Sequence, residues 1–199
     1  MAAEKKYKVL VFLVLLTGLQ TAFFANGSQD SEIENIIKAQ NISDLAFSNI
    51  LGRIKPGMTE KEIAVEFEYQ IKKCGADDIA FDIIVGSGEN GALCHAVPSD
   101  RKLKYGDLVV LDFGSKVNGY CSDMTRTVVL GKADDKQREI YNIVLEAQLA
   151  AISGIKAGMT GKEADSLARD VITARGYGDN FGHGLGHGVG LAIHEHPRA

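Results

Sequence analysis

The chain has 199 residues, of which 45% are hydrophobic and 24% are charged, a balance typical of a globular domain. This composition excludes a disordered tail, a collagen and a disulfide-rich miniprotein. The net charge is −4, with acidic and basic residues mixed along the chain, so nucleic-acid binding through a basic face is not expected. Three cysteines without a CxxC spacing exclude a disulfide framework and a structural zinc finger.

The N-terminal segment starts with lysines and continues as an apolar run over residues 9–24, followed by a small-x-small triplet at 25–27. This order is typical of a secretory signal peptide. The run is too short and too interrupted to predict a transmembrane span. The alternative is a buried strand and loop that belong to a preceding domain. Residues 1–30 are therefore interpreted as an apolar leader, either a signal peptide or a remnant of an N-terminal domain.

The next two segments predict helices. Residues 31–53 carry isoleucine and leucine at three- and four-residue steps, which indicates a long amphipathic helix. Residues 60–74 predict a second helix, because Thr59 and Glu62 have the spacing of a capping box at its start and Gly75 stops it.

The same helix-start signal occurs a second time. Residues 155–164 align with residues 54–63 at an offset of 101, with Thr160 and Glu163 in the capping-box positions. Two unrelated helices with similar caps are the alternative, but the number of matching residues favours a repeat.

The surroundings of the two signals also correspond. Residues 135–153 mirror the helical pattern of residues 31–53. After each copy, glycines lead into a short histidine-containing segment that ends in proline, at 94–98 and at 194–197. The sequence therefore predicts an internal duplication of a helix–helix–strand unit.

Between the copies, residues 107–131 are predicted to form β-structure. Residues 108–111 read as an apolar strand, Asn118-Gly119 is a strong two-residue hairpin signal, and residues 125–130 read as the returning strand. The order of helices and strands predicts an α+β domain with helices packed on one face of a mostly antiparallel sheet.

Two carboxylates are predicted on one face of this hairpin. Asp112 interrupts the apolar strand, where burial is costly unless the group is paired or bound to a metal. A turn at 118–119 places Asp112 opposite Thr125 and puts Asp123 on the same face, as a diagonal neighbour roughly 7–8 Å away. Two acids without an evident cationic partner suit divalent metals. The alternative is that one acid caps the turn and the other pairs with Arg126.

Four of the five histidines lie within residues 183–196, namely His183, His187, His194 and His196. The alternating glycines around them predict extended chain or a tight loop rather than a helix. The segment matches neither a nucleotide-binding loop nor an HExxH zinc motif. Metal binding and proton transfer explain this cluster better than isolated structural histidines.

A nucleophilic cysteine is the rival chemistry, because Cys94 precedes His95. Adjacent residues on a strand point to opposite faces, so the two side chains are not expected to form a thiolate–imidazole pair.

Taken in chain order, these motifs resemble the Xaa-Pro peptidases, aminopeptidase P and prolidase, of the pita-bread metallopeptidase family that also contains methionine aminopeptidase and creatinase. The segments that carry the resemblance are HAVP (95–98), LDFG (111–114), DMTRT (123–127), GHGLGHGVG (182–190) and HE (194–195). The resemblance implies a pita-bread fold with a pseudo-two-fold duplication. It also implies hydrolysis of the peptide bond that precedes a proline near the N-terminus of a peptide. A methionine aminopeptidase and a non-catalytic peptide- or partner-binding module on the same fold are the alternatives.

The resemblance further implies two divalent metal ions, manganese or cobalt before zinc or iron, held by two aspartates, one histidine and two glutamates. It assigns Asp112, Asp123 and His187 as metal ligands, with Asp123 bridging both ions. His95 and His194 would steer substrate and proton transfer, and His183 would line the substrate pocket. The implied partner is a peptide with proline at its second position. A homodimer is the oligomeric state considered. The resemblance favours the cytoplasm, whereas a signal peptide would favour export.

The duplication predicts where the remaining carboxylates belong. Asp112 and Asp123 follow His95 by 17 and 28 residues, so the matching acids after His194 are expected somewhat beyond position 210. Residues 31–199 are therefore expected to be an incomplete catalytic domain that lacks its C-terminal part, binds metal weakly and hydrolyses little or no peptide.

Overall fold

The computed structural model of the chain describes residues 10–12 and 29–199. The predicted leader and its small-x-small triplet therefore lie largely outside the described residues. The described piece of it is strand β1 (Leu10–Phe12), which pairs antiparallel with β7 (Met124–Val129). Over the described ranges, no helix has the length and apolar character needed to cross a membrane.

The predicted helices are confirmed to within about two residues. They are α1 (Gln29–Leu51), α2 (Glu60–Lys73), α3 (Asp135–Gly154) and α4 (Gly161–Ala174). Both predicted capping boxes form, with Thr59 and Glu62 at α2 and with Thr160 and Glu163 at α4. Each threonine accepts a hydrogen bond from the third helical amide, so backbone donors that a helix start leaves unpaired are satisfied.

The duplication extends to the backbone of the turns. Gly57 and Gly158, which precede the two capping boxes, have φ values of +91° and +90°. Gly75 and Gly176, which follow α2 and α4, have φ values of +103° and +83°. Glycine adopts this left-handed region without the clash that a Cβ atom brings, so the repeated glycines fix equivalent turns.

The strands of the described residues form three antiparallel sheets. Besides β1 and β7, they are β2 (Asp78–Ile79), β3 (Ile84–Ser87), β4 (Leu108–Phe113), β5 (Ser115–Val117), β6 (Tyr120–Cys121), β8 (His187–Gly188) and β9 (Glu195–Arg198). Two short 3₁₀ helices are η1 (Gly88–Ala92), which follows β3, and η2 (Gly178–Asn180), which follows α4. The strand orders are β1-β7-β4-β3, β2-β5-β6 and β8-β9, which confirms the predicted antiparallel α+β arrangement.

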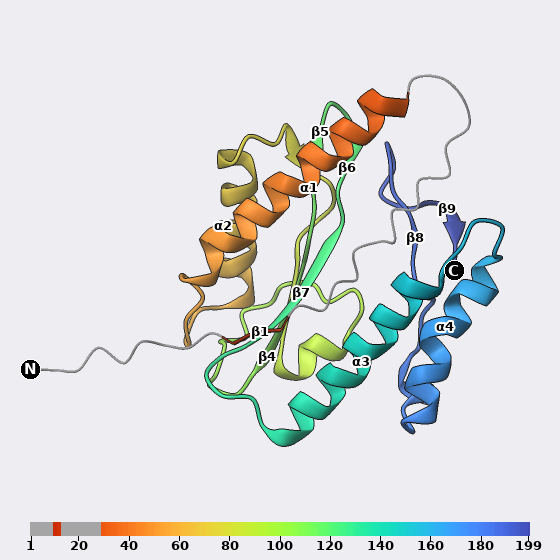
Figure 1. The fold of residues 1–199 in the computed structure, drawn as a ribbon. Helices are drawn as coiled ribbons and strands as arrows, with labels where there is room; N and C mark the ends of the chain where they lie inside the picture. The colour runs from red at the N-terminus through yellow and green to blue at the C-terminus, as the bar shows by residue number, and fades with distance from the viewer. Residues whose placement is uncertain (1–9, 13–28) are drawn as a thin grey trace, which may run out of the picture.

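Helices α1 and α2 cover one face of the largest sheet (Figure 1). Alternate residues of β4 point into this core, where Val109, Leu111 and Phe113 are fully buried. The ring of Phe113 lies 4.1 Å from that of Phe67 on α2, measured between centroids. Because side chains alternate along a strand, Asp112 faces the opposite side of the sheet, away from the two helices.

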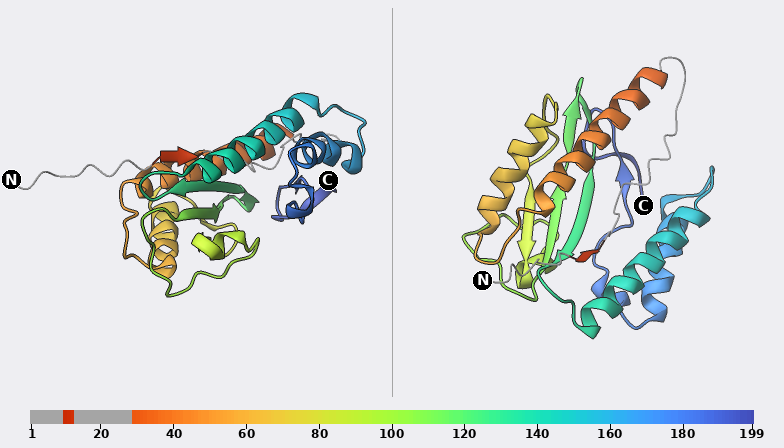
Figure 2. Two further views of the ribbon diagram at one scale, coloured as in Figure 1. Left: turned by 90° about the horizontal axis from the view of Figure 1, so that it is seen from below. Right: turned by 60° about the vertical axis from the view of Figure 1, so that its left-hand side comes forward.

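Helices α3 and α4 pack side by side on the other side of the molecule, next to β8 and β9 (Figures 1 and 2). Their shared core is small and rich in alanine. It consists of Ile143, Ala147, Ala151, Ala168 and Ile172.

One local prediction is wrong. Cys94 and His95 do not lie on a strand but in an exposed turn after η1, which the Ala96 N–H closes by donating to the Leu93 carbonyl. The corresponding histidine of the second copy, His194, stands directly before strand β9. The two proline-ended segments therefore correspond in sequence but not in backbone conformation. The expectation that these two side chains point to opposite faces of a strand therefore does not apply.

Candidate metal and catalytic site

The register of the central hairpin is the one predicted. Asp112 of β4 is paired with Thr125 of β7, and Val117 is paired with Tyr120 at the turn. Asn118 and Gly119 have φ values of +51° and +85°, as a tight two-residue turn requires.

The two predicted carboxylates, Asp112 and Asp123, are called the aspartate pair below. Met124 is fully buried against the helices. Since side chains alternate, its neighbours Asp123 and Thr125 face the other side of the sheet, together with Asp112. The hairpin thus carries both carboxylates on the face that the helices leave free.

Burial raises the pKa values of both members of the aspartate pair, and repulsion by Asp112 adds to it at Asp123. Burial is the main cause of the raised pKa of Asp112, which the Thr125 hydrogen bond and the charges of His95 and His187 partly offset. Burial together with the negative charge of Asp112 raises the pKa of Asp123 to about 7. Two nearby carboxylates cannot both ionise cheaply in a half-buried site unless a cation joins them.

Thr125 is a site residue to which the sequence reasoning gave no role. Its Oγ1 hydroxyl donates to Oδ1 of Asp112 at 2.9 Å and so fixes the orientation of that carboxylate. The signal was present in the predicted register, because directly opposed side chains on one sheet face can hydrogen-bond.

The structural alternative for the aspartate pair is wrong. Arg126 points into the helix-covered face, 3.5 Å from Asp44, and donates to the carbonyl of Thr125. At the hairpin turn, the Asn118 amide donates to Asp77. Within the described residues, neither member of the aspartate pair forms an ion pair with lysine or arginine.

His187 of β8 faces this pair. Its Nε2 atom lies 3.5 Å from Oδ2 of Asp123. Its Nδ1 atom lies 2.9 Å from the carbonyl oxygen of Gly188. A proton on Nδ1 would be donated to that carbonyl and would leave the Nε2 lone pair directed at Asp123, the tautomer that a metal ligand needs.

The glycine-rich segment is attached to the hairpin by backbone contacts. The Cys121 amide donates to the carbonyl of Gly190 at 2.8 Å, two residues from Asp123. The Cys121 thiol lies 3.7 Å from the Leu191 carbonyl oxygen. These contacts bring two segments far apart in the sequence to one site.

Two more predicted histidines border the site. The ring of His194 lies edge-on to that of His187, with centroids 4.4 Å apart. Burial, then the positive charges of His187, Arg198 and His95, lower the pKa of His194. His95 is exposed on its turn, within electrostatic reach of both Asp112 and His194.

His183 stands apart from the aspartate pair. Its exposed ring packs against Phe181, with centroids 5.0 Å apart, and its Nδ1 lies 2.8 Å from the Gly184 carbonyl oxygen. It lines, together with His187, a cavity of about 660 Å³ that lies among α1, the α3–α4 helices and the β8–β9 segment. The role of His183 in binding substrate stays a prediction.

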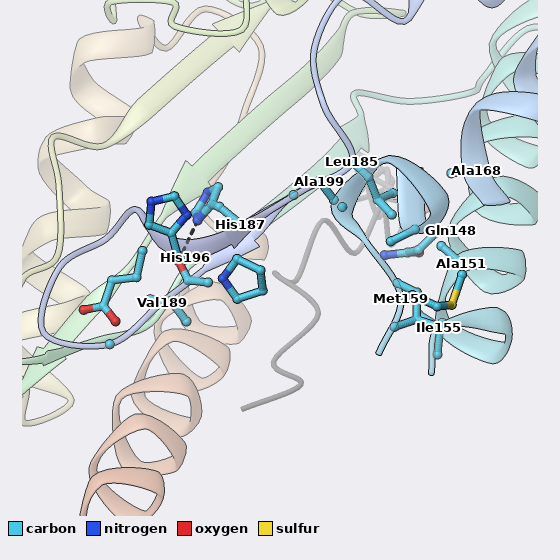
Figure 3. A pocket seen from close by; sticks show the side chains of 18 of the residues that line it. Gln148, Ala151, Ile155, Met159, Ala168, Leu185, His187, Val189, His196 and Ala199 are labelled. Atoms are coloured by element: carbon cyan, nitrogen blue, oxygen red, sulfur yellow. Dashed lines mark hydrogen bonds between the residues drawn. The ribbon is translucent and has the colours of Figure 1, made fainter. Parts of the chain in front are cut away.

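Figure 3 shows the two ends of this cavity. Ala151, Ile155 and Met159 line its apolar end, and His187 and His196 line the end near β8 and β9.

The donor set fits a divalent cation in chemistry but is small. Two carboxylates and one imidazole are ligands that manganese, cobalt, zinc and iron accept. A bound cation would offset the repulsion that Asp112 exerts on Asp123 and would favour the ionised form of both carboxylates. In the part of the chain that the structure describes, however, no three His, Cys, Asp or Glu side chains converge closely enough to hold a metal ion.

Comparisons with known proteins agree on one family. The model of metallopeptidase family M24 matches residues 34–199. The chain is 53% identical over 167 residues to an Xaa-Pro dipeptidase of Pyrococcus furiosus, covering 84% of this chain and 48% of that protein. It is 51% identical over 166 residues to an uncharacterized peptidase of Bacillus subtilis, covering 83% of this chain and 47% of that protein.

Solved structures give the same result. An Xaa-Pro dipeptidase from Bacillus anthracis matches with a TM-score of 0.84 and 54% identity, over 86% of this chain and 48% of that chain. A prolidase from Pyrococcus furiosus matches with a TM-score of 0.83 and 52% identity, over 86% of this chain and 51% of that chain. The chain thus spans about half the length of the relatives it matches.

Proposed function

Because the chain belongs to metallopeptidase family M24, we propose that residues 31–199 form catalytic-domain structure of an Xaa-Pro peptidase. The proposed reaction is hydrolysis of the peptide bond that precedes a proline near the N-terminus of a peptide. Family membership and the matched structures confirm the resemblance and the pita-bread α+β fold expected from the sequence. The relatives named Xaa-Pro dipeptidase and prolidase support this substrate class.

The observation that carries the proposal is the aspartate pair facing His187. Asp112, Asp123 and His187 would hold divalent metal, and two ions, manganese or cobalt before zinc or iron, are proposed. When bound, these ions supply Lewis-acid polarisation of the scissile carbonyl and activation of water. The Thr125 hydroxyl holds Asp112 in place, and the Gly188 carbonyl orients the His187 ring. Only these three donors are proposed from the described residues, so binding is expected to be weak.

The remaining histidines are proposed to handle protons and substrate. Burial lowers the pKa of His194 and so favours the neutral imidazole, the form that can accept a proton. His95 is proposed to act on the same site from its exposed turn. His183, at the cavity, is proposed to contact the peptide.

The decisive test is calorimetric titration of the 199-residue chain with Mn²⁺ or Co²⁺, beside the variant Asp123→Asn. The expected result is weak binding that the substitution abolishes, because it removes the carboxylate that faces His187. Equal binding by both proteins would contradict the assignment of the site.

Peptide assays then test the substrate class. Metal-loaded chain is expected to cleave Ala-Pro peptides slowly or not at all, and robust turnover would contradict the expected weakness of a three-donor site. Preference for Met-Ala over Ala-Pro peptides would favour a methionine aminopeptidase. Absence of any metal-dependent heat would favour a non-catalytic binding module. Sedimentation velocity is a separate test, which would distinguish a monomer from the proposed homodimer.

A further inference from the structure

An ion pair on α4 makes unusually many contacts with the glycine-rich loop. Arg169 Nε lies 2.5 Å from Oδ2 of Asp165, and Nη2 lies 3.0 Å from Oδ1 of the same carboxylate. The two residues are one helical turn apart, so the pair forms on one face of α4. A two-point contact between guanidinium and carboxylate fixes both side chains in orientation as well as in distance.

Both members of the pair also hydrogen-bond to the loop backbone. Arg169 Nη1 donates to the carbonyl of Phe181, and Nη2 donates to the carbonyl of His183, both at 2.8 Å. Oδ1 of Asp165 accepts from the amide of Leu185 at 3.0 Å. The guanidinium also lies over the Phe181 ring, 4.4 Å from its centroid. One ion pair therefore holds the main chain at three alternate residues.

The loop needs such external support. Its alternating glycines have high conformational freedom, so hydrogen bonds from outside must select one path. On its other side, the Gly186 carbonyl accepts from the Ala199 amide at 2.9 Å. The next residue is His187, whose Nε2 faces Asp123. The path of the chain through Leu185 therefore contributes to the position of the His187 ring, together with the contacts of Gly186 and of β8.

We propose that Arg169 and Asp165 are a positioning pair, which fixes the loop backbone over residues 181–185 and thereby places His187 opposite Asp123. The pair touches neither the aspartate pair nor the His187 ring, so it acts through the backbone. The role of the pair in metal binding rests on the proposed function, whereas its hydrogen bonds to the loop backbone do not depend on that function.

The structure offers a matched control at the C-terminal cap of the same helix. Arg175 pairs with Glu146 at 2.6 Å, and both side chains are half-exposed. Its guanidinium donates to no loop carbonyl in the described hydrogen bonds. Arg175→Ala therefore removes an arginine and an ion pair without touching the proposed support of the loop.

The experiment compares Arg169→Ala, Arg169→Lys and Arg175→Ala in the full chain without metal. Amide hydrogen exchange at Leu185 and the imidazole ¹⁵N shifts of His187 are measured by NMR. Arg169→Ala is expected to speed Leu185 exchange about tenfold or more and to shift the His187 signals, because two loop carbonyls lose their donor and Asp165 loses its partner. Arg169→Lys keeps a charge for Asp165 but cannot bridge both carbonyls, so an intermediate effect is expected. Arg175→Ala should change neither signal.

A second arm measures Co²⁺ affinity by the visible absorption of the bound ion. Arg169→Ala is expected to weaken binding about ten- to hundredfold, as substitutions behind a metal ligand commonly do, with Arg175→Ala unchanged. If wild-type chain binds no Co²⁺, the proposed function fails, and the exchange and ¹⁵N data still judge the positioning pair. Unchanged exchange and His187 shifts in both Arg169 variants would overturn the inference. If Arg169→Ala does not fold, Arg169→Lys against Arg175→Ala decides.

Discussion

The two copies of the helix pair have the same starting signals but bury different surfaces. Among the residues that the structure describes, α1 and α2 contribute to a core of sixteen buried residues that includes the sheet, whereas α3 and α4 share a core of five. Equivalent helix positions carry Ile63, Phe67 and Ile71 in the first copy and Ala164, Ala168 and Ile172 in the second. The difference teaches that caps determine where a helix starts, whereas packing partners determine what its apolar face stabilises.

The copies also hold their histidine-bearing loops differently. Glu60, the first residue of α2, is fully buried, and its carboxylate accepts hydrogen bonds from Ser87, Asn90 and Ser99. These donors flank the turn that carries His95. The equivalent residue of α4 is Gly161, where a Cβ atom would lie 2.0 Å from the Arg198 carbonyl oxygen.

The largest expected effect is the loss of unfolding free energy when equivalent core residues of the two copies are replaced by alanine. Ile71→Ala is expected to cost about 4 kcal/mol, because Ile71 is fully buried between helix and sheet. Ile172→Ala should cost about 2 kcal/mol, because Ile172 also lines the cavity, where neighbours are fewer. Urea unfolding of both variants measures the difference. Equal losses would mean that the second copy is packed as tightly as the first.

Sequence patterns predicted the features that depend on neighbours along the chain. The capping boxes need only residues three apart, and the Asp112–Thr125 register follows from the turn because no bulge interrupts the hairpin. The turn at His95 was missed because contacts across the fold, through Glu60, decide the path of that loop. The Arg169–Asp165 pair had a visible spacing of four residues, but its loop contacts depend on tertiary structure.

The next prediction concerns the stability effect of Asp123, which faces His187 of the second copy. Its pKa of about 7 exceeds the ordinary value near 3.9, so the folded state favours the protonated form. The contribution of this protonated carboxyl group to the free energy of unfolding is fully present below the unfolded pKa of about 3.9 and is lost as the pH rises through 7. Metal-free Asp123→Asn should therefore be more stable than wild type at pH 8, by up to about 4 kcal/mol, and nearly equal to it near pH 4.

Thermal unfolding in the presence of a chelator at both pH values measures this effect. Added Mn²⁺ should reverse the order at pH 8 by stabilising only the wild type. A variant that is less stable than wild type without metal at pH 8 would contradict the view that burial and the charge of Asp112 disfavour the ionised Asp123 carboxylate.

A smaller loss is expected when the anchor of the first loop is changed. Glu60→Gln should cost about 2 kcal/mol at pH 7, because the amide accepts fewer and weaker hydrogen bonds from Ser87 and Ser99. Burial tends to raise the pKa of Glu60, but the serine hydrogen bonds outweigh it, and the pKa is lowered. The carboxylate thus stabilises the fold above its unfolded pKa of about 4.3, and this is lost as the pH falls through the lower folded value.

The cost of Glu60→Gln should accordingly shrink between pH 7 and pH 3 in urea unfolding. Glu68→Gln, an exposed change on the same helix, is the control and should stay within about 0.5 kcal/mol. A pH-independent cost would mean that shape, not charge, matters at position 60.

The smallest effect tests what the copies share. Thr59→Ala and Thr160→Ala should each cost about 1 kcal/mol, since both threonines accept from the third helical amide in the same geometry. Amide exchange at Glu62 and Glu163 reads each helix start directly, even if α3 and α4 open separately from the sheet. Equal increases in exchange would show that the caps act without regard to packing. A larger increase at Glu163 would mean that a thin core also weakens the start of its helix, so that cap and core are coupled in the second copy.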